Sequence, residues 1–379
     1  MTDIWIAPEQ LFDGERLHTG KALRLLDDQV VEIASATSAA LPLKGCLTPG
    51  FVDLQVNGGG GVMLNDTPTR QAMTKVAAAH RRFGTVAILP TVITDAPDVL
   101  DRAAQAVIEA QGDQGILGLH IEGPHISYAR RGTHNGRFIR DLDDRTMEVV
   151  ARLRRRNVNV MITVAPEAST PQQISMLSSL GAIVSIGHTD ADAETVEAAI
   201  AAGAKCATHL FNAMSPMTGR APGAVGTVLN SNLCSGIICD GYHVDDRMIA
   251  LALRARPKAD LMFLVSDAMA TVGGPDKFSL YGQEVHLCDG RLLNVEGNLA
   301  GAHITQAQGV ARLVKHIGVS LESALRMAVT VPASVVGDAG LTELVGRKTQ
   351  DLVVVSKDLS QIGLLADVTG SAMNENAAE

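Results

Sequence analysis

The sequence predicts an α/β protein: a closed (β/α)8 barrel of the TIM type, with a small β-sandwich module built from both chain ends. Three observations support this fold. Eight short apolar runs alternate with longer segments of helical period between residues 51 and 265. Segments of β character flank this region on both sides. Polar residues follow several of the runs, and barrel enzymes gather their active sites at the carboxyl ends of the strands.

Composition limits the class of protein. With 379 residues, of which 46% are hydrophobic and 19% charged, the chain exceeds one average domain and can bury a large core. A net charge of −9 and an aromatic content of 3% argue against a nucleic-acid partner. No uncharged apolar stretch is long enough to span a membrane, and the N-terminus lacks a signal-peptide pattern. We expect neither a nucleic-acid nor a membrane partner.

The five cysteines indicate the compartment. Their number is odd and none are spaced as C-x-x-C. We therefore expect no disulfides and a reducing, cytoplasmic location.

The two ends of the chain have β character. Residues 1–48 contain short apolar pieces interrupted by Asp-Gly and Asp-Asp turns, which is the chemistry of β-hairpins. Residues 340–370 return to β character with the apolar run 352–355. We expect 1–48 and 340–370 to pair as the small β-module, 49–339 to form the barrel, and the small polar residues 371–379 to form a disordered tail.

Eight apolar runs are expected to form the barrel strands: 51–56, 86–91, 116–121, 158–164, 183–186, 205–208, 236–239 and 261–265. Segments between them suit amphipathic helices, such as 191–202 with Asp190 as N-cap and Gly203 as the stop. An open doubly wound sheet is the alternative, but the glycines at 58–61 lack the G-x-G-x-x-G spacing of that fold.

The region after the eighth strand is expected to leave the barrel rhythm. Residues 272–303 are rich in Gly and Asp, with a hairpin turn predicted at Asp289-Gly290. Helices are expected at about 304–317 and 321–330. Ser320 and Ser323 provide only weak capping of the second helix, because a Glu or Gln is needed at the fourth position of a capping box.

Two histidines end neighbouring expected strands. His188 follows 183–186 and His209 follows 205–208, so one βα unit separates them. A lone histidine in such a place is most often a core residue. Two at the same rim of a parallel sheet are better explained as metal ligands, since neutral imidazole is a common ligand of transition metals.

A carboxylate ends the third expected strand. Glu122 lies between an isoleucine and Gly-Pro, where it is poorly solvated unless it meets a cation. With His188 and His209 it completes an open three-ligand set that suits catalytic zinc. The alternative is an ion pair with an arginine such as Arg131. We expect His120 to point to the other face of the strand and to be structural.

Asp267 follows the eighth strand and precedes no obvious helix, so it is not required as a cap. It is expected to face the metal and to take a proton from water there. Arg220, His243 and His134 add cationic or hydrogen-bonding groups at the same rim, and such groups suit a phosphate or carboxylate ligand.

Six motifs in order resemble the N-acetylglucosamine-6-phosphate deacetylases of the amidohydrolase superfamily. They are Pro49-Gly50-Phe51-Val52-Asp53-Leu54-Gln55-Val56-Asn57-Gly58, Gly118-Leu119-His120-Ile121-Glu122-Gly123-Pro124, Gly187-His188-Thr189, Thr208-His209-Leu210-Phe211-Asn212-Ala213-Met214, Asp240-Gly241-Tyr242-His243-Val244 and Ser266-Asp267-Ala268. The motifs extend from residue 49 to about 303, and the flanking β-module is also similar.

The resemblance implies a barrel hydrolase that converts N-acetyl-D-glucosamine 6-phosphate to glucosamine 6-phosphate and acetate in amino-sugar catabolism. It implies one divalent metal per subunit, expected to be zinc with iron, manganese or cobalt as alternatives. It implies that Glu122, His188 and His209 bind the metal and that Asp267 is the acid/base catalyst. It implies that His134 polarises the acetyl carbonyl. The sugar phosphate is implied to be bound by Asn212, the Ala213 backbone, Arg220 and His243. A homodimer is expected, with Arg220 and His243 reaching a neighbouring subunit's site.

Two departures from the superfamily pattern matter. Many amidohydrolases carry His-x-His at the end of strand one, which supports a second metal, whereas this chain has Gln55 and Asn57 there. Amides are poor zinc ligands, so this second-metal position is expected to be vestigial. His125 and His303 stand where other residue types are expected, and the sequence assigns them no role.

Two rival functions remain open at this stage. Another cyclic-amide or N-acyl amidohydrolase, such as a dihydroorotase-like or isoaspartyl-dipeptidase-like enzyme, fits the barrel but not the single-metal strand one or the pair Arg220 and Asn212. A non-catalytic scaffold predicts loss of the ligands, yet Glu122, His188, His209 and Asp267 are all present.

Overall fold

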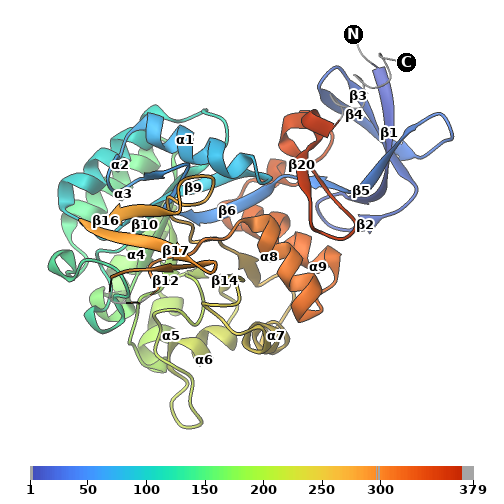
Figure 1. The fold of residues 1–379 in the computed structure, drawn as a ribbon. Coiled ribbons are helices and arrows are strands. Elements are labelled where there is room, and N and C mark those ends of the chain that lie inside the picture. The colour runs from blue at the N-terminus through green and yellow to red at the C-terminus, as the bar shows by residue number, and fades with distance from the viewer. Residues whose placement is uncertain (1–2, 296, 298, 369–379) are drawn as a thin grey trace.

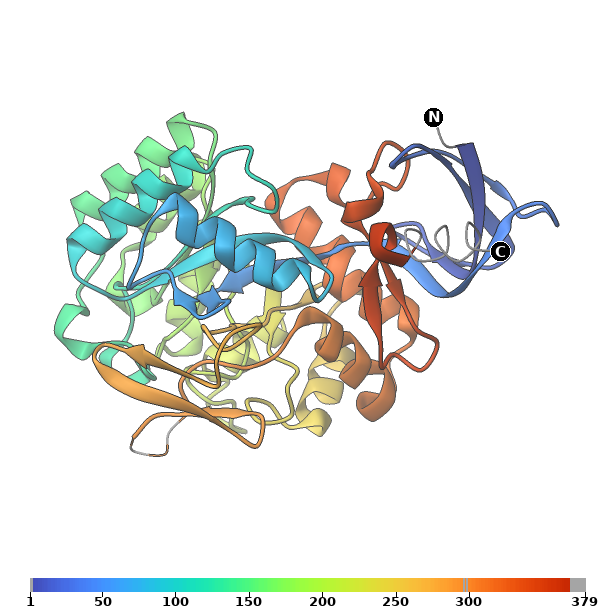
Figure 2. The same cartoon turned by 45° about the horizontal axis from the view of Figure 1, so that its top comes forward.

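The structure is a computed structural model that describes residues 3–295, 297 and 299–368. Its two parts, a barrel and a sheet module, lie side by side (Figures 1 and 2). The expected disordered tail, 371–379, lies outside the described residues. Within the described ranges no helix has the length and apolar character needed to cross a bilayer.

Eight parallel strands form the barrel in sequence order: β6 (Phe51–Val56), β9 (Thr85–Ile93), β10 (Gly118–Glu122), β11 (Asn159–Val164), β12 (Ile183–Ile186), β13 (Cys206–Ala207), β14 (Cys234–Ile237) and β15 (Met262–Leu264). A parallel bridge between Val56 and Ala268 joins the last segment to the first. This closure confirms the predicted barrel and excludes the open doubly wound sheet.

Helices surround the strands: α1 (Arg70–Arg81), α2 (Pro97–Glu109), α3 (Asp144–Arg155), α4 (Pro171–Ser179), α5 (Ala193–Ala201), α6 (Gly223–Leu229) and α7 (Asp246–Ala255) (Figure 1). Their apolar faces and the outward faces of the strands share one core; Val150 and Leu153 of α3, for example, belong to the same buried cluster as Ile162 of β11. The predicted cap of α5 was wrong. Asp192 caps it, while Asp190 forms an ion pair with Arg130.

The helices after the barrel match the predicted ranges. Helix α8 (Gln306–Arg312) continues as a π-helical turn through Leu313–Ile317, and α9 (Leu321–Leu325) continues through Arg326–Thr330. The Ser320 side chain accepts from the Ser323 backbone N–H over 3.1 Å, so the weak cap is formed. A third helix, α10 (Val331–Val336), was not predicted.

The sheet module joins both ends of the chain. Strand β19 (Leu352–Val355) pairs antiparallel with β5 (Leu41–Pro49), which leads directly into the first barrel strand. The other strands of this seven-stranded sheet are β1 (Asp3–Phe12), β2 (Leu17–His18), β3 (Lys21–Leu26), β4 (Gln29–Ser35) and β20 (Ile362–Leu364). Of the expected β segment 340–370, the described part up to residue 368 forms only the strands β19 and β20, and 339–341 and 349–351 form 3-10 turns.

A three-stranded antiparallel sheet covers part of the barrel mouth. It consists of β16 (Lys277–Leu280), β17 (Gln283–Cys288) and β18 (Arg291–Leu293), with the predicted turn at Asp289-Gly290 and a second, unpredicted turn at Tyr281-Gly282. Leu280, Val285 and Leu292 pack in one buried cluster with Met269 and Ile93. The short pair β7 (Gly58–Gly59) and β8 (Val62–Met63) lies at the exit of β6.

Candidate active site and metal centre

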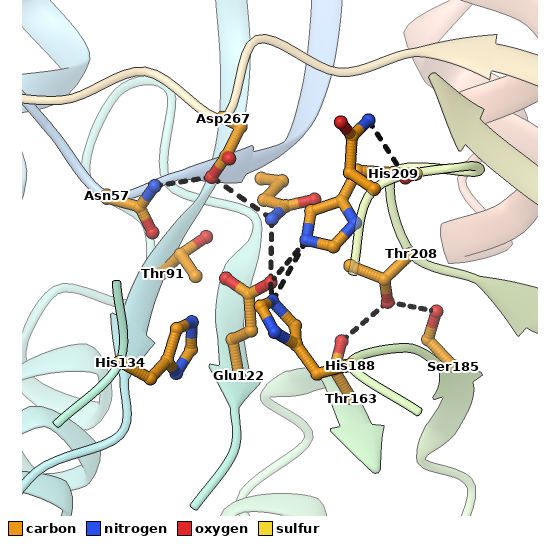
Figure 3. A network of polar contacts seen from close by, with 12 residues as sticks. Asn57, Thr91, Glu122, His134, Thr163, Ser185, His188, Thr208, His209 and Asp267 are labelled. Atoms are coloured by element: carbon orange, nitrogen blue, oxygen red, sulfur yellow. Dashed lines mark hydrogen bonds and ion pairs between the residues drawn. The ribbon is translucent and has the colours of Figure 1, made fainter. Parts of the chain in front are cut away.

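Three side chains from three strand ends meet inside the barrel mouth (Figure 3). Oε1 of Glu122 lies 3.2 Å from Nε2 of His188 and 3.1 Å from Nε2 of His209. The two Nε2 atoms are 3.1 Å apart. All three side chains are buried. Parallel strands bring their carboxyl ends to one rim, which is why residues 87 positions apart in the chain become neighbours.

The spacing of these atoms fits a divalent metal. Tetrahedral zinc with bonds of about 2.0–2.1 Å places its ligand atoms about 3.3 Å apart. Nδ1 of His188 lies 2.9 Å from the Arg130 carbonyl oxygen. A carbonyl only accepts, so Nδ1 carries the hydrogen and neutral Nε2 presents a lone pair. A lone pair facing a carboxylate oxygen is repulsive unless a cation lies between them, so these residues fit a metal.

His134 forms a second, overlapping group. One ligand atom each from Glu122, His134 and His188 lies within 4.8 Å of the others. Nδ1 of His134 already pairs with Thr94 Oγ1 at 2.8 Å, whereas Nε2 of His209 lies 3.1 Å from both Glu122 Oε1 and His188 Nε2. His209 is therefore the better third ligand. Burial, then the neighbouring His188, lowers the pKa of His134 to about 3, so its imidazole is neutral.

Two amides from the first strand hold two carboxylates. Nδ2 of Asn57 donates to Oδ1 of Asp267 over 2.6 Å, and Nε2 of Gln55 donates to Asp267 Oδ1 and Glu122 Oε1 over 3.1 and 3.0 Å. Burial and the negative charge of Glu122 raise the pKa of Asp267 to about 6. For Glu122, burial raises the pKa, but the imidazoles of His188 and His209 beside its carboxylate outweigh burial and hold the pKa well below its usual range.

The backbone is strained at several of these residues. His188, His209 and Asp267 have φ values of 47°, 27° and 50°. This left-handed region is uncommon for residues other than glycine and costs about 1–2 kcal/mol each. Such strain is concentrated at functional sites in proteins. The left-handed conformation at each of these strand exits ends the extended backbone where the chain turns across the mouth.

A cavity of about 190 Å³ lies above the cluster. The predicted residues Asn57, His134, Asn212, Ala213 and His243 line it together with Glu122, His188, His209 and Asp267. Nδ1 of His243 pairs with Oδ2 of Asp240 at 2.6 Å. Arg220 does not join this group: it is exposed on the loop after strand β13 and is absent from the cavity wall.

Three further histidines, which the sequence analysis singled out, are explained by their contacts. His120 was predicted to face away from Glu122, which is wrong, because residues two apart on a strand share a face. Its ring bonds the Leu54 carbonyl and Thr163 Oγ1 below the site. His125 is structural: it bonds two backbone carbonyls and Thr146 Oγ1. His303 bonds Thr271 Oγ1 and lies outside the cavity that Glu122, His188 and His209 line.

Several supporting residues were not predicted. Beneath the ligands, Thr208 Oγ1 lies 2.6 Å from both Thr163 Oγ1 and Ser185 Oγ, which continues the contact of His120 (Figure 3). Thr94 and Asp53 were also missed. Asp53 lies within the predicted strand 51–56, and Thr94 lies three residues beyond the predicted strand 86–91, directly after the observed β9. Arg131 packs over the Tyr128 ring instead of pairing with Glu122, so that alternative was wrong.

Comparison with known proteins gives consistent matches. A model described as "Amidohydrolase family" matches residues 46–377. An N-acetylgalactosamine-6-phosphate deacetylase of Shewanella sp. is 42% identical over 318 residues, 83% of this chain and 80% of the relative. An N-acetylglucosamine-6-phosphate deacetylase of Haemophilus influenzae is 33% identical over 329 residues, 85% of each chain. A crystal structure of the Pasteurella multocida N-acetylglucosamine-6-phosphate deacetylase superposes with a TM-score of 0.86 at 33% identity, covering 94% and 96% of the two chains.

Proposed function

The chain belongs to the amidohydrolase family, and from this premise we propose that it hydrolyses the acetamide of N-acetyl-D-glucosamine 6-phosphate to glucosamine 6-phosphate and acetate. The observation that carries the proposal is the buried set of Glu122, His188 and His209 with Asp267 beside it on the wall of one cavity. The names of the relatives, which are deacetylases of N-acetylated hexosamine 6-phosphates, support the substrate class.

One divalent metal, proposed to be zinc, would be held by Glu122, His188 and His209. When bound there, it supplies a Lewis acid that polarises the acetyl carbonyl and lowers the pKa of water. Gln55 and Asn57 support a single metal, because their amide nitrogens donate to the two carboxylates and leave no anionic ligand set for a second ion.

Asp267 acts as the general base and then the general acid. Asn57 and Gln55 hold its Oδ1, and its raised pKa of about 6 lies closer to neutral pH than that of an ordinary aspartate. It takes a proton from the attacking water as the new C–O bond forms. It passes that proton to the amine nitrogen as the C–N bond breaks. Neutral His134 donates a hydrogen bond to the acetyl oxygen as negative charge develops on it.

The sugar phosphate is held by Asn212, the backbone at Ala213 and His243, all of which line the cavity. The exposed position of Arg220 fits a role in the site of a second copy. We therefore include a homodimer, in which Arg220 serves the partner's phosphate, and a cytoplasmic location in the proposal. The expected partner is a small phosphorylated sugar, with no nucleic acid or membrane.

A second candidate substrate is the galactosamine epimer, N-acetylgalactosamine 6-phosphate, which is favoured by the 42% identity to the Shewanella enzyme.

The test is acetate release by zinc-reconstituted protein from both 6-phosphates and from unphosphorylated N-acetylglucosamine. We expect the highest kcat/KM for the glucosamine 6-phosphate and a loss of at least about a hundredfold without the phosphate. Preference for the epimer would reassign the substrate. Absence of acetate from every sugar, together with cleavage of a cyclic amide, would favour the rival amidohydrolases. A protein that binds no added metal and hydrolyses none of these substrates would favour a scaffold.

A further inference from the structure

The turn between β16 and β17 contains an unexpected residue. Leu280 pairs with Gln283, so Tyr281 and Gly282 form a two-residue hairpin loop, and their φ values are +52° and +79°. Two positive φ angles are the mark of a type I′ turn, for which Asn-Gly is preferred. A bulky residue in the first position costs about 1–2 kcal/mol. Residues with such an unfavourable backbone conformation are concentrated at functional sites, where their side chains make specific contacts.

The Tyr281 phenol joins two loops of the active site. Its hydroxyl donates to the Thr94 carbonyl oxygen over 2.5 Å, and the backbone N–H of Asn135 donates to its oxygen. Thr94 directly follows β9, and Asn135 directly follows His134 in the chain. One hydroxyl group on the hairpin therefore ties a barrel strand exit to the loop that carries a proposed catalytic histidine.

Thr94 continues this connection through its side chain. Its Oγ1 lies 2.8 Å from Nδ1 of His134, and both side chains are buried. Within the described residues, Thr94 Oγ1 has no other hydrogen-bond partner. A buried hydroxyl hydrogen needs an acceptor, and Nδ1 is the acceptor available to it. Thr94 therefore donates, Nδ1 accepts, and the single ring hydrogen of neutral His134 lies on Nε2.

Gly123 leaves room for the Thr94 hydroxyl beside its backbone. A Cβ added to Gly123, which has φ +78°, would lie 2.2 Å from Thr94 Oγ1. Glycine at position 123 thus leaves just the room that the threonine hydroxyl occupies. Tyr281, Thr94, His134 and Asn135 form a closed circuit in which each member restrains the next.

We propose that Tyr281 and Thr94 are positioning residues for His134, which fix the orientation of its ring and keep its hydrogen on Nε2. This inference deepens the proposed function and rests on it, because His134 uses that hydrogen to hold the acetyl oxygen. The hairpin β16–β17 is then part of the catalytic apparatus rather than only a cover of the barrel mouth.

The first test compares substitutions that remove one hydroxyl each. Tyr281→Phe and Thr94→Val should lower kcat by about tenfold or more, with little change in KM, because misplacing a catalytic group weakens the transition state. Thr94→Ser, which keeps the hydroxyl, should retain most activity. Tyr242→Phe is the matched control: it loses a 2.6 Å bond to the Asp289 carbonyl at the other turn of the same sheet and should leave kcat unchanged. Equal losses in Tyr281→Phe and Tyr242→Phe would overturn the proposal.

The second test asks whether the effect passes through His134. In a His134→Ala background, Tyr281→Phe should cause no further loss, whereas an additive loss would overturn the proposal. Nitrogen-15 NMR of the imidazoles, with His134 identified by its absence in His134→Ala, should show the Nε2–H tautomer in the wild type and a shift away from it in Thr94→Val. An unchanged tautomer in Thr94→Val would also overturn it. The NMR result does not depend on turnover, so a protein that shows this shift but releases no acetate would contradict the proposed function and not the positioning.

Discussion

Nδ2 of Asn57 lies 2.6 Å from Oδ1 of Asp267, so an amide beside the first barrel strand holds the proposed catalytic base beyond the last strand. This contact crosses the point where the barrel closes, next to the bridge between Val56 and Ala268. Asn57, which was predicted to occupy a vestigial second-metal position, donates to the Asp267 carboxylate, orients it and lowers its pKa.

Asn57→Ala should move the pH dependence of the reaction. The Asn57 bond lowers the pKa of Asp267, which burial and Glu122 raise to about 6. Loss of the bond therefore raises this pKa further. Since the base must be ionised, kcat/KM falls as the pH falls through its pKa, and the acidic limb of the profile should shift to higher pH. Measurement of kcat/KM between pH 5 and 9 checks this, and an unmoved limb with normal activity would argue against the role of Asn57.

Asp267→Asn should remove turnover while sparing binding. The amide keeps the shape of the carboxylate but cannot take a proton from water, so kcat should fall by about 10²–10⁴-fold. Metal content and the calorimetric affinity for substrate should stay near those of the wild type. Near-normal acetate release by this variant would reject Asp267 as the base.

Removal of the metal should abolish activity reversibly. Dialysis against a chelator should stop acetate release, and added zinc should restore it. His209→Gln should lower the bound metal well below one ion per chain, because one of three ligands is lost. His303→Gln is the control, since His303 lies outside the catalytic cavity. Full metal occupancy in His209→Gln would favour His134 as the third ligand.

Asp53→Asn should change how stability depends on pH. Asp53 is fully buried and accepts from the backbone N–H groups of Gln55 and Ser266, and burial raises its pKa from 3.8 to about 6. Its folded pKa exceeds its unfolded pKa, so its contribution to stability is complete below 3.8 and is lost as the pH rises through about 6. That rise corresponds to about 3 kcal/mol of unfolding free energy. Urea denaturation between pH 4 and 7 should show the wild type losing up to this amount relative to Asp53→Asn. A constant difference between the two proteins would refute the assignment.

Gly123→Ala should reduce both stability and activity. The added methyl group meets Thr94 Oγ1 and occupies a backbone with positive φ, which costs about 1–2 kcal/mol before any clash is relieved. Displacement of Thr94 should also lower kcat. Gly219→Ala is the control, because an added Cβ there meets nothing within 4 Å. Thermal unfolding and acetate release measure the two effects; equal behaviour of the two variants would contradict this explanation.

Much of the site followed from the order of elements in the chain. Apolar runs of strand length ended at Glu122, His188, His209 and Asp267, and eight parallel strands bring such ends to one rim. The turn at Asp289-Gly290 was predictable for a local reason, since that dipeptide favours positive φ at both positions.

Other features depend on contacts between distant segments. His120 is an exception, because its side of the strand has a local cause. It is two residues from Glu122 on one strand and therefore shares its face, so the prediction that it faces away was wrong. Helix α5 begins at Ala193 and is capped by Asp192, while Asp190 forms an ion pair with Arg130 from another loop. The exclusion of Arg220 from the cavity depends on the path of its loop, which no local pattern specifies.

The sequence by itself determined the barrel, the pairing of the chain ends and the residue types at the strand exits, because periodicity and turn chemistry are local. Only the tertiary structure decided the left-handed backbone at His188, His209 and Asp267 and the placement of the Tyr281 hydroxyl against Thr94. Those conformations are unfavourable locally, and surrounding packing and hydrogen bonds must stabilise them. They arise from residues up to about two hundred positions apart, so no stretch of sequence read alone contains them.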